Sequence, residues 1–228
     1  MNVNTERFYG RRQGKPLRPG QKARLERLLP RLSIAGDEPI GEPERLFGRP
    51  VRDLWLEIGF GGGEHLLAQA MAHPDTGMIG CEPFMNGVSK LLGRIEECGI
   101  DNIRIHCDDV RLLFPRLGEA SLGRVFILFA DPWPKTRHHK RRIINTATLD
   151  ALSRLMRNGA ELRIATDHMP YARWILQHVL EHCDFEWLAE GPEDWRRRPA
   201  DWPPTRYEQK ALQRGGACVY YRFRRHDR

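Results

Sequence analysis

From Val51 onward, short apolar runs alternate with segments whose apolar residues recur at helical spacing. The predicted strands are 54–58, 78–81, 103–106, 125–130, 161–165, 185–189 and 218–223, and the predicted helices are 64–71, 84–95, 144–156 and 168–182. The run 125–130 contains no polar residue, which is typical of a strand covered on both faces. The alternation predicts an α/β fold with a Rossmann-like, mostly parallel, doubly wound sheet, whose ligands bind at the carboxyl ends of the strands.

The chain has 228 residues, which suffices for one domain with a short extension. Residues 1–50 are rich in Gly, Pro and Arg and are predicted to form a basic N-terminal arm. Residues 51–228 are predicted to form the α/β domain. The net charge is +7, with a pI near 9.4, and the basic residues gather in the first part of the arm. This balance favours a polyanionic partner.

Two helix ends carry local signals. The arm has one predicted helix, and Pro30 is expected to end it early because proline breaks the backbone hydrogen-bond ladder. Its apolar face consists of Leu25, Leu28, Leu29 and Leu32. For the helix 168–182, Asp167 is expected to be the N-cap residue.

The cysteines are five in number, scattered, and without a C-x-x-C pair. This pattern argues against a disulfide framework and a zinc site, so no metal is expected, and it favours a reducing compartment. No apolar run approaches the length of a membrane span, and the arginine-rich start lacks the apolar core of a signal peptide. The sequence predicts a soluble, cytoplasmic protein and carries no signal of oligomeric state.

A glycine-rich turn follows the first predicted strand. Gly59 and Gly61 allow a ligand to approach the backbone closely, although a tight turn without a ligand would look the same. A dinucleotide fingerprint requires glycine at position 64, where this chain has Glu64, and Glu57 adds a second carboxylate nearby. These charges disfavour a pyrophosphate and favour a cationic, phosphate-free nucleoside such as S-adenosylmethionine. Glu82 lies 19 residues after Gly63, a spacing that suits ribose hydroxyls, although a solvated carboxylate is the simpler alternative.

Acidic residues also follow three later predicted strands. Asp108 and Asp109 come after the third strand, where an exposed acidic turn is an equal alternative, and Asp167 follows the fifth. Asp131 is expected to end the fourth strand and is followed by Trp133, which could stack on a base or plug the core. Five cations then follow, namely Lys135, Arg137, Lys140, Arg141 and Arg142. Such a charge run is usually a solvated face, but beside a candidate carboxylate it suggests phosphate contacts.

Six blocks in this order resemble the bacterial tRNA (guanine-N7)-methyltransferase family. They are Glu57-Ile58-Gly59-Phe60-Gly61, Glu82, Asp131-Pro132-Trp133-Pro134-Lys135, Arg137-His138-His139-Lys140-Arg141-Arg142, Ala165-Thr166-Asp167 and Thr205-Arg206-Tyr207-Glu208. The resemblance runs from about residue 50 to the end of the chain. Tyr207 stands where the family usually has phenylalanine, and Asp108 beside Asp109 leaves open which one meets the adenine.

The resemblance implies a class I methyltransferase that transfers a methyl group to N7 of a guanine in the tRNA variable loop. The implied S-adenosylmethionine-binding residues are Glu57, Gly59, Gly61, Glu82, Asp109 and Asp131, with Asp131 as the catalytic residue. The implied binding residues for the target guanosine are Lys135, Asp167, Thr205, Arg206, Tyr207 and Glu208. The implied tRNA-binding residues are Arg137, His138, His139, Lys140, Arg141 and Arg142.

The chemistry of guanine N7 assigns a role to Asp131. N7 carries an in-plane lone pair and no proton, so methyl transfer needs no general base. Asp131 is therefore expected to orient the reactants and to stabilise the positive charge that develops on the purine. Two alternatives remain open on the residues alone: a non-catalytic RNA-binding protein on a methyltransferase scaffold, and a nicotinamide-dependent oxidoreductase, which Glu64 disfavours.

Overall fold

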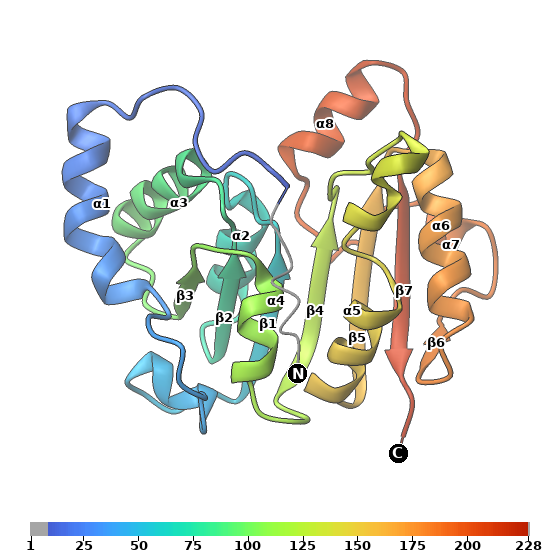
Figure 1. Cartoon of the computed structure of the whole chain (residues 1–228), viewed down its shortest axis with the longest axis horizontal. Helices are drawn as coiled ribbons and strands as arrows, with labels where there is room; N and C mark the ends of the chain where they lie inside the picture. The colour runs from blue at the N-terminus through green and yellow to red at the C-terminus, as the bar shows by residue number, and fades with distance from the viewer. Residues whose placement is uncertain (1–8, 228) are drawn as a thin grey trace.

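A computed structural model describes residues 9–227, which form one seven-stranded sheet with helices on both faces (Figure 1). The strands are β1 (Asp53–Ile58), β2 (Thr76–Cys81), β3 (Ile103–His106), β4 (Leu122–Leu128), β5 (Met156–Thr166), β6 (Phe185–Trp187) and β7 (Val219–Arg225). The helices are α1 (Pro19–Leu32), α2 (Glu64–Ala72), α3 (Met85–Cys98), α4 (Val110–Leu113), α5 (Thr146–Leu155), α6 (Met169–Leu180), α7 (Glu193–Arg196) and α8 (Arg206–Gln213). Three 3₁₀ helices, η1 (Pro43–Phe47), η2 (Phe114–Arg116) and η3 (Thr136–Arg141), complete the described elements.

The order of the strands in the sheet is β3-β2-β1-β4-β5-β7-β6. The strands β1 to β5 are parallel, and β7 runs antiparallel between β5 and β6. The chain leaves β1 toward β2 and β3 on one side and returns to β4 on the other, so the strand order reverses between β1 and β4. This confirms the predicted mostly parallel, doubly wound sheet, and its carboxyl ends gather along the upper edge in Figure 1. Ligands of open α/β sheets bind at such a reversal.

Alternate residues of β1 supply the two apolar cores. Leu56 packs with α4, α5 and α6 on one face of the sheet, whereas Trp55 packs with α2, α3 and α8 on the other. Period-two alternation of the strand places Glu57 on the same face as Trp55, toward α2. The side to which each β1 side chain points therefore follows from its position along the strand.

The basic arm packs onto the domain. The helix α1 lies beside α3, its leucines join the α2–α3 core cluster, and Arg24 and Arg27 both pair with Glu96. The expectation that Pro30 ends this helix early is wrong, because α1 includes Pro30 and continues to Leu32. Proline removes one backbone hydrogen bond, and packing of the leucine face against α3 compensates for that loss.

Two predicted boundaries at the carboxyl edge of the sheet also differ, by one and by three residues. His168, and not Asp167, caps α6, because its Nδ1 accepts a hydrogen bond from the backbone N–H of Tyr171. The strand β4 ends at Leu128, three residues before Asp131, because Phe129 adopts a left-handed backbone with φ +53°. Within residues 9–227, no helix is both long and apolar enough to cross a bilayer.

Candidate active site at the carboxyl edge of the sheet

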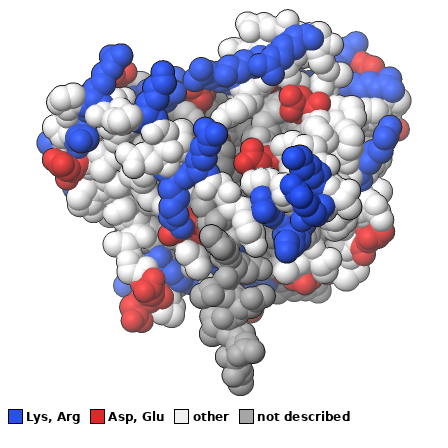
Figure 2. Space-filling model, turned by 45° about the horizontal axis from the view of Figure 1, so that its top comes forward, with Lys and Arg blue, Asp and Glu red and all other residues white. Residues whose placement is uncertain are grey.

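A pocket of about 640 Å³ opens at the carboxyl ends of β1, β2 and β4. Figure 2 turns this edge forward and shows carboxylates flanked by Lys and Arg side chains. The predicted or candidate residues that line the pocket are Gly59, Gly61, Glu82, Asp108, Asp109, Asp131, Trp133, Arg141 and Tyr207. The fold thus brings together acidic residues that lie as far as 49 positions apart in the sequence, from Glu82 to Asp131.

The glycine turn is built for a close backbone approach. Gly59 and Gly61 have φ values of +75° and +56°, which other residues rarely adopt. A Cβ on Gly87 would lie 2.1 Å from the carbonyl oxygen of Gly61, so α3 presses directly against the turn. Only glycine fits at this contact.

Glu82 ties the turn to the next strand. Its Oε2 accepts a hydrogen bond from the backbone N–H of Gly61 at 2.7 Å, and its Oε1 accepts one from Phe84 at 2.9 Å. Burial raises the pKa of Glu82 above its ordinary value, with a smaller contribution from Asp131, while the two backbone hydrogen bonds oppose the shift. Glu82 therefore shapes the pocket as well as lining it.

The two glutamates that flank the glycine turn point away from this pocket. Glu57 is buried, and its Oε2 lies 2.7 Å from Nδ1 of His65 on α2. Glu64 faces a neighbouring hollow and pairs with Arg94 at 3.3 Å. The acidity of this pocket therefore comes from Glu82 and the aspartates, whereas the sequence argument had counted Glu57 and Glu64 together with Glu82.

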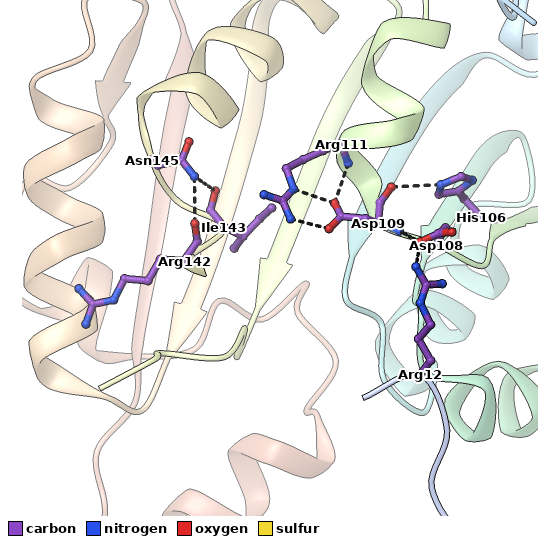
Figure 3. Close-up of polar contacts among 8 residues, drawn as sticks. All are labelled: Arg12, His106, Asp108, Asp109, Arg111, Arg142, Ile143 and Asn145. Atoms are coloured by element: carbon purple, nitrogen blue, oxygen red, sulfur yellow. Dashed lines mark hydrogen bonds and ion pairs between the residues drawn. The ribbon is translucent and has the colours of Figure 1, made fainter. Parts of the chain in front are cut away.

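Asp108 and Asp109 point to different arginines, as Figure 3 shows. Asp108 accepts a hydrogen bond from Arg12 of the arm at 2.6 Å, and this contact lowers the pKa of Asp108 despite the opposing effect of burial. Asp109 caps α4 and binds Arg111 through Nε at 2.9 Å and Nη2 at 2.6 Å. Both carboxylates line the pocket with fixed orientations.

The segment that carries Asp131 has a strained backbone. Phe129 and Trp133 have φ values of +53° and +42°, a region that costs about 1–2 kcal/mol for residues other than glycine. The two turns hold Asp131 and Trp133 at the pocket, and burial raises the pKa of Asp131. Strain of this kind gathers at functional sites, where the surrounding structure maintains it. Trp133 lines the pocket and does not plug the core.

The basic segment divides into exposed residues and one internal anchor. Lys135, Arg137 and Lys140 are exposed on or next to η3, where they can meet an anion. Arg142 is buried: its Nε donates to the carbonyl of Pro132 at 2.8 Å, and its guanidinium lies 4.6 Å from the ring centroid of Trp174. The expected contact of Arg142 with tRNA is not supported by this geometry, because its guanidinium faces the protein.

The remaining members of the basic segment contact aromatic rings. Arg141 lies over Trp133 at 5.0 Å and over Tyr9 at 4.5 Å. His138 packs edge-on against Trp133, and His139 packs against Trp174 of α6. These contacts hold η3 between the pocket and α6.

The block Thr205–Glu208 opens a helix, although taken alone it suggested a loop. Thr205 caps α8 and Glu208 bonds back to its backbone N–H, which is the reciprocal pattern that a T-x-x-E sequence signals. Glu208 is buried, accepts a hydrogen bond from the hydroxyl of Tyr220 and forms an ion pair with Arg198. Of this block, Tyr207 lines the pocket, while Asp167 is exposed after β5 and lies outside the pocket lining.

The arm supplies site residues that the sequence argument missed. Tyr9 lines the pocket, and Arg12 reaches Asp108. Next to them, Asn86 of α3 accepts a hydrogen bond from the N–H of Gly14 and donates one to the carbonyl of Lys15. Charge alone indicated a basic arm, and no residue pattern indicated that its first described residues cross the pocket.

Comparison with known proteins is consistent with this geometry. Residues 52–220 match the model of a family described as "Putative methyltransferase". The tRNA (guanine-N(7)-)-methyltransferase of Rhodospirillum rubrum is 54% identical over 97% of this chain and 89% of its own length. The enzyme of the same name from Paramagnetospirillum magneticum is 50% identical over 97% of this chain and 94% of its own length.

Solved structures resemble the chain in fold. The 16S rRNA methyltransferase KamB aligns with a TM-score of 0.56 and 12% identity, over 83% of this chain and 95% of that one. An rRNA methylase from Streptococcus thermophilus aligns with a TM-score of 0.53 and 13% identity, over 83% and 98%. The fold is that of a class I methyltransferase, and with relatives near half identity along nearly the whole length, the chain belongs to the tRNA (guanine-N7)-methyltransferase family.

Proposed function

We propose that this chain transfers a methyl group from S-adenosylmethionine to N7 of a guanine in the variable loop of tRNA. The observation that carries the proposal is the juxtaposition of an acidic pocket at the carboxyl edge of the sheet with exposed cations on η3. The names of the relatives support the same reaction. A tRNA substrate and five free cysteines fit an enzyme of the cytoplasm.

The residues of the pocket fit S-adenosylmethionine. The donor is a nucleoside with a cationic sulfonium and no phosphate. Four carboxylates line the pocket against three arginines, and one of these, Arg111, is paired with Asp109. Gly59 and Gly61 leave room beside the backbone, and Glu82 is placed for ribose hydroxyls. When bound, S-adenosylmethionine supplies an electrophilic methyl group.

Asp131 is the proposed catalytic residue. Guanine N7 needs no deprotonation, so the carboxylate acts on charge and orientation and not as a base. The strained turns at Phe129 and Trp133 fix its position before substrate arrives. A fixed carboxylate in a partly desolvated site stabilises the positive charge that the purine gains during transfer.

The proposed substrate contacts surround this carboxylate. The target guanine must leave its stack, because duplex RNA hides N7 in a deep, narrow groove. Lys135, Asp167 and the block Thr205–Glu208 are the proposed guanosine-binding residues, and the rings of Tyr207 and Trp133 at the pocket offer stacking faces. The exposed Arg137 and Lys140 and the half-buried Arg141 contact phosphates.

Mass spectrometry of nucleosides tests the proposal. Unmodified tRNA is incubated with the purified protein and S-adenosylmethionine and digested to nucleosides, among which 7-methylguanosine is expected. Mass spectrometry of ribonuclease fragments of the same tRNA should place it in the variable loop. A protein that binds tRNA but leaves it free of 7-methylguanosine would instead be the non-catalytic RNA-binding alternative. Omitting the donor provides the control.

A further inference from the structure

A second hollow lies on the other side of Tyr207 from the donor pocket. Its volume is about 150 Å³, and it shares Gly61, Phe84 and Tyr207 with the larger pocket. A Cβ on Gly61 would lie 3.3 Å from Cε2 of Tyr207, so the ring closes against the glycine turn. The two hollows are neighbours, separated by one aromatic ring and one turn.

Three cations line this second hollow. Lys90 comes from α3, and Arg206 and Lys210 lie four residues apart on α8, where they share a helix face. All three side chains are exposed, and none forms an ion pair within the described range 9–227. Glu64 also lines the hollow, but Arg94 offsets its charge at 3.3 Å. Three like charges without a partner repel one another, and a bound anion would relieve that repulsion.

These cations and the η3 segment lie on opposite faces of the sheet. Ala211 of α8 packs into the core cluster that α2 and α3 share. The segment η3 leads into α5, whose Leu149 belongs to the cluster of the other face, and it contacts α6 through His139. Basic side chains therefore flank the donor pocket from both faces, with the carboxylates between them (Figure 2).

We propose that Lys90, Arg206 and Lys210 form a binding site for an RNA phosphodiester next to the target guanosine. The inference rests on the proposed function. A guanine that reaches Asp131 stays attached to the phosphates on either side of it, and the acidic pocket repels them. On the α3–α8 face of the sheet, the hollow beyond Tyr207 offers such a phosphate three cations that have no ion-pair partner among the described residues, so the backbone is held on both faces of the sheet edge.

The double variant Lys90→Ala/Lys210→Ala tests this site and leaves Arg206 beside Tyr207 unchanged. Binding of unmodified tRNA is measured at several salt concentrations, and binding of S-adenosylmethionine is measured by calorimetry. Loss of two phosphate contacts is expected to weaken tRNA binding roughly threefold to thirtyfold at low salt. The slope of log affinity against log salt should become shallower by about 1 to 2. Affinity for the donor should stay unchanged.

A matched control removes the same charge elsewhere. Arg31→Ala/Arg52→Ala deletes two exposed arginines, one at the end of α1 and one before β1. For this control, the slope of log affinity for tRNA against log salt should stay close to that of the wild type. If the lysine variant and the arginine control have equal affinities and slopes, the proposed site is wrong.

A charge-neutral methylphosphonate beside the target guanosine distinguishes a local contact from general electrostatics. The methylphosphonate is placed at the 5′ phosphate in one RNA and at the 3′ phosphate in another. At one of these two positions it should weaken binding to the wild type without further weakening binding to the lysine variant. Additive losses at both positions would overturn the proposal. Failure of wild-type protein to methylate tRNA would instead refute the proposed function, so the two failures are distinguishable.

Discussion

The two hollows on either side of Tyr207 share part of their walls and differ in their balance of charge. Four carboxylates and three arginines line the pocket at Asp131, whereas three cations and Glu64 line the hollow between α3 and α8. The glycine turn that contains Gly61 lines both hollows. The difference supports the proposal that this sheet edge separates two charged ligands: a cationic nucleoside on the acidic side and an RNA backbone on the basic side.

Removal of the central carboxylate should have the largest effect. Asp131→Asn keeps the shape of the side chain but removes its charge, so single-turnover methyl transfer on saturating tRNA should fall roughly 10²- to 10³-fold. Affinity for tRNA should change little, because the role proposed for Asp131 is to act on the reacting base and not on the phosphates. Weak tRNA binding with normal turnover of the bound complex would contradict this division between the acidic and basic sides.

Displacement of the glycine turn that lines the acidic pocket should have the second-largest effect. In Gly87→Ala, the new Cβ would lie 2.1 Å from the carbonyl oxygen of Gly61, so the turn must move. Overpacking of this kind costs about 1–3 kcal/mol of folding free energy, and donor affinity should fall at least about tenfold. Chemical denaturation and calorimetry measure the two losses. Gly20→Ala, where no atom lies within 4 Å of the new Cβ, should leave both unchanged.

A third experiment compares the buried and the exposed members of the basic segment, which should affect stability and tRNA binding differently. Arg142→Ala removes a guanidinium packed on Trp174 and bonded to Pro132, and should lower folding free energy by about 1–3 kcal/mol. Its salt slope for tRNA should stay near that of the wild type. Arg137→Ala/Lys140→Ala should do the reverse, with little change in stability and a shallower slope. Equal slopes for the two variants would show that the division is wrong.

Affinity for S-adenosylmethionine should depend on pH, and this is the smallest of the four predicted effects. Burial raises the pKa of Glu82 and of Asp131, so both protonate at a higher pH than ordinary carboxyl groups. A cationic donor favours the charged forms, so affinity should be full above the raised pKa values and fall, by up to about tenfold per pH unit, as pH drops below them. Calorimetry across this range measures the effect, and Glu82→Gln should reduce the pH dependence. A pH-independent affinity would contradict the charge-based account.

The sequence predicted the acidic side better than the basic one. Strand and helix periodicity located β1 to β5 because a buried parallel sheet imposes continuous apolar runs, and the residues after each run had to share one edge. Side-chain direction was the main error: Glu57 faces α2 because of strand alternation, and Glu64 pairs with Arg94. Local spacing alone does not indicate such partners.

Several other features depended on long-range packing. Arg142 is buried because Trp174, 32 residues later, supplies its stacking face. Tyr9 lines the pocket and Arg12 reaches Asp108 because α1 docks on α3. Lys90 and Lys210 line one hollow because α3 and α8 pack into the same core cluster. Only the capping box at Thr205 carried a local signal that the sequence argument overlooked.

One crossed measurement tests the separation of the two ligands most directly. Affinities for S-adenosylmethionine and for tRNA are measured on Glu82→Gln and on Lys90→Ala/Lys210→Ala under the same conditions. The account predicts that Glu82→Gln weakens donor binding and spares tRNA, and that the lysine variant weakens tRNA binding and spares the donor. If both variants lose the same ligand, or if the losses are exchanged, the two sides of Tyr207 do not have the roles assigned here.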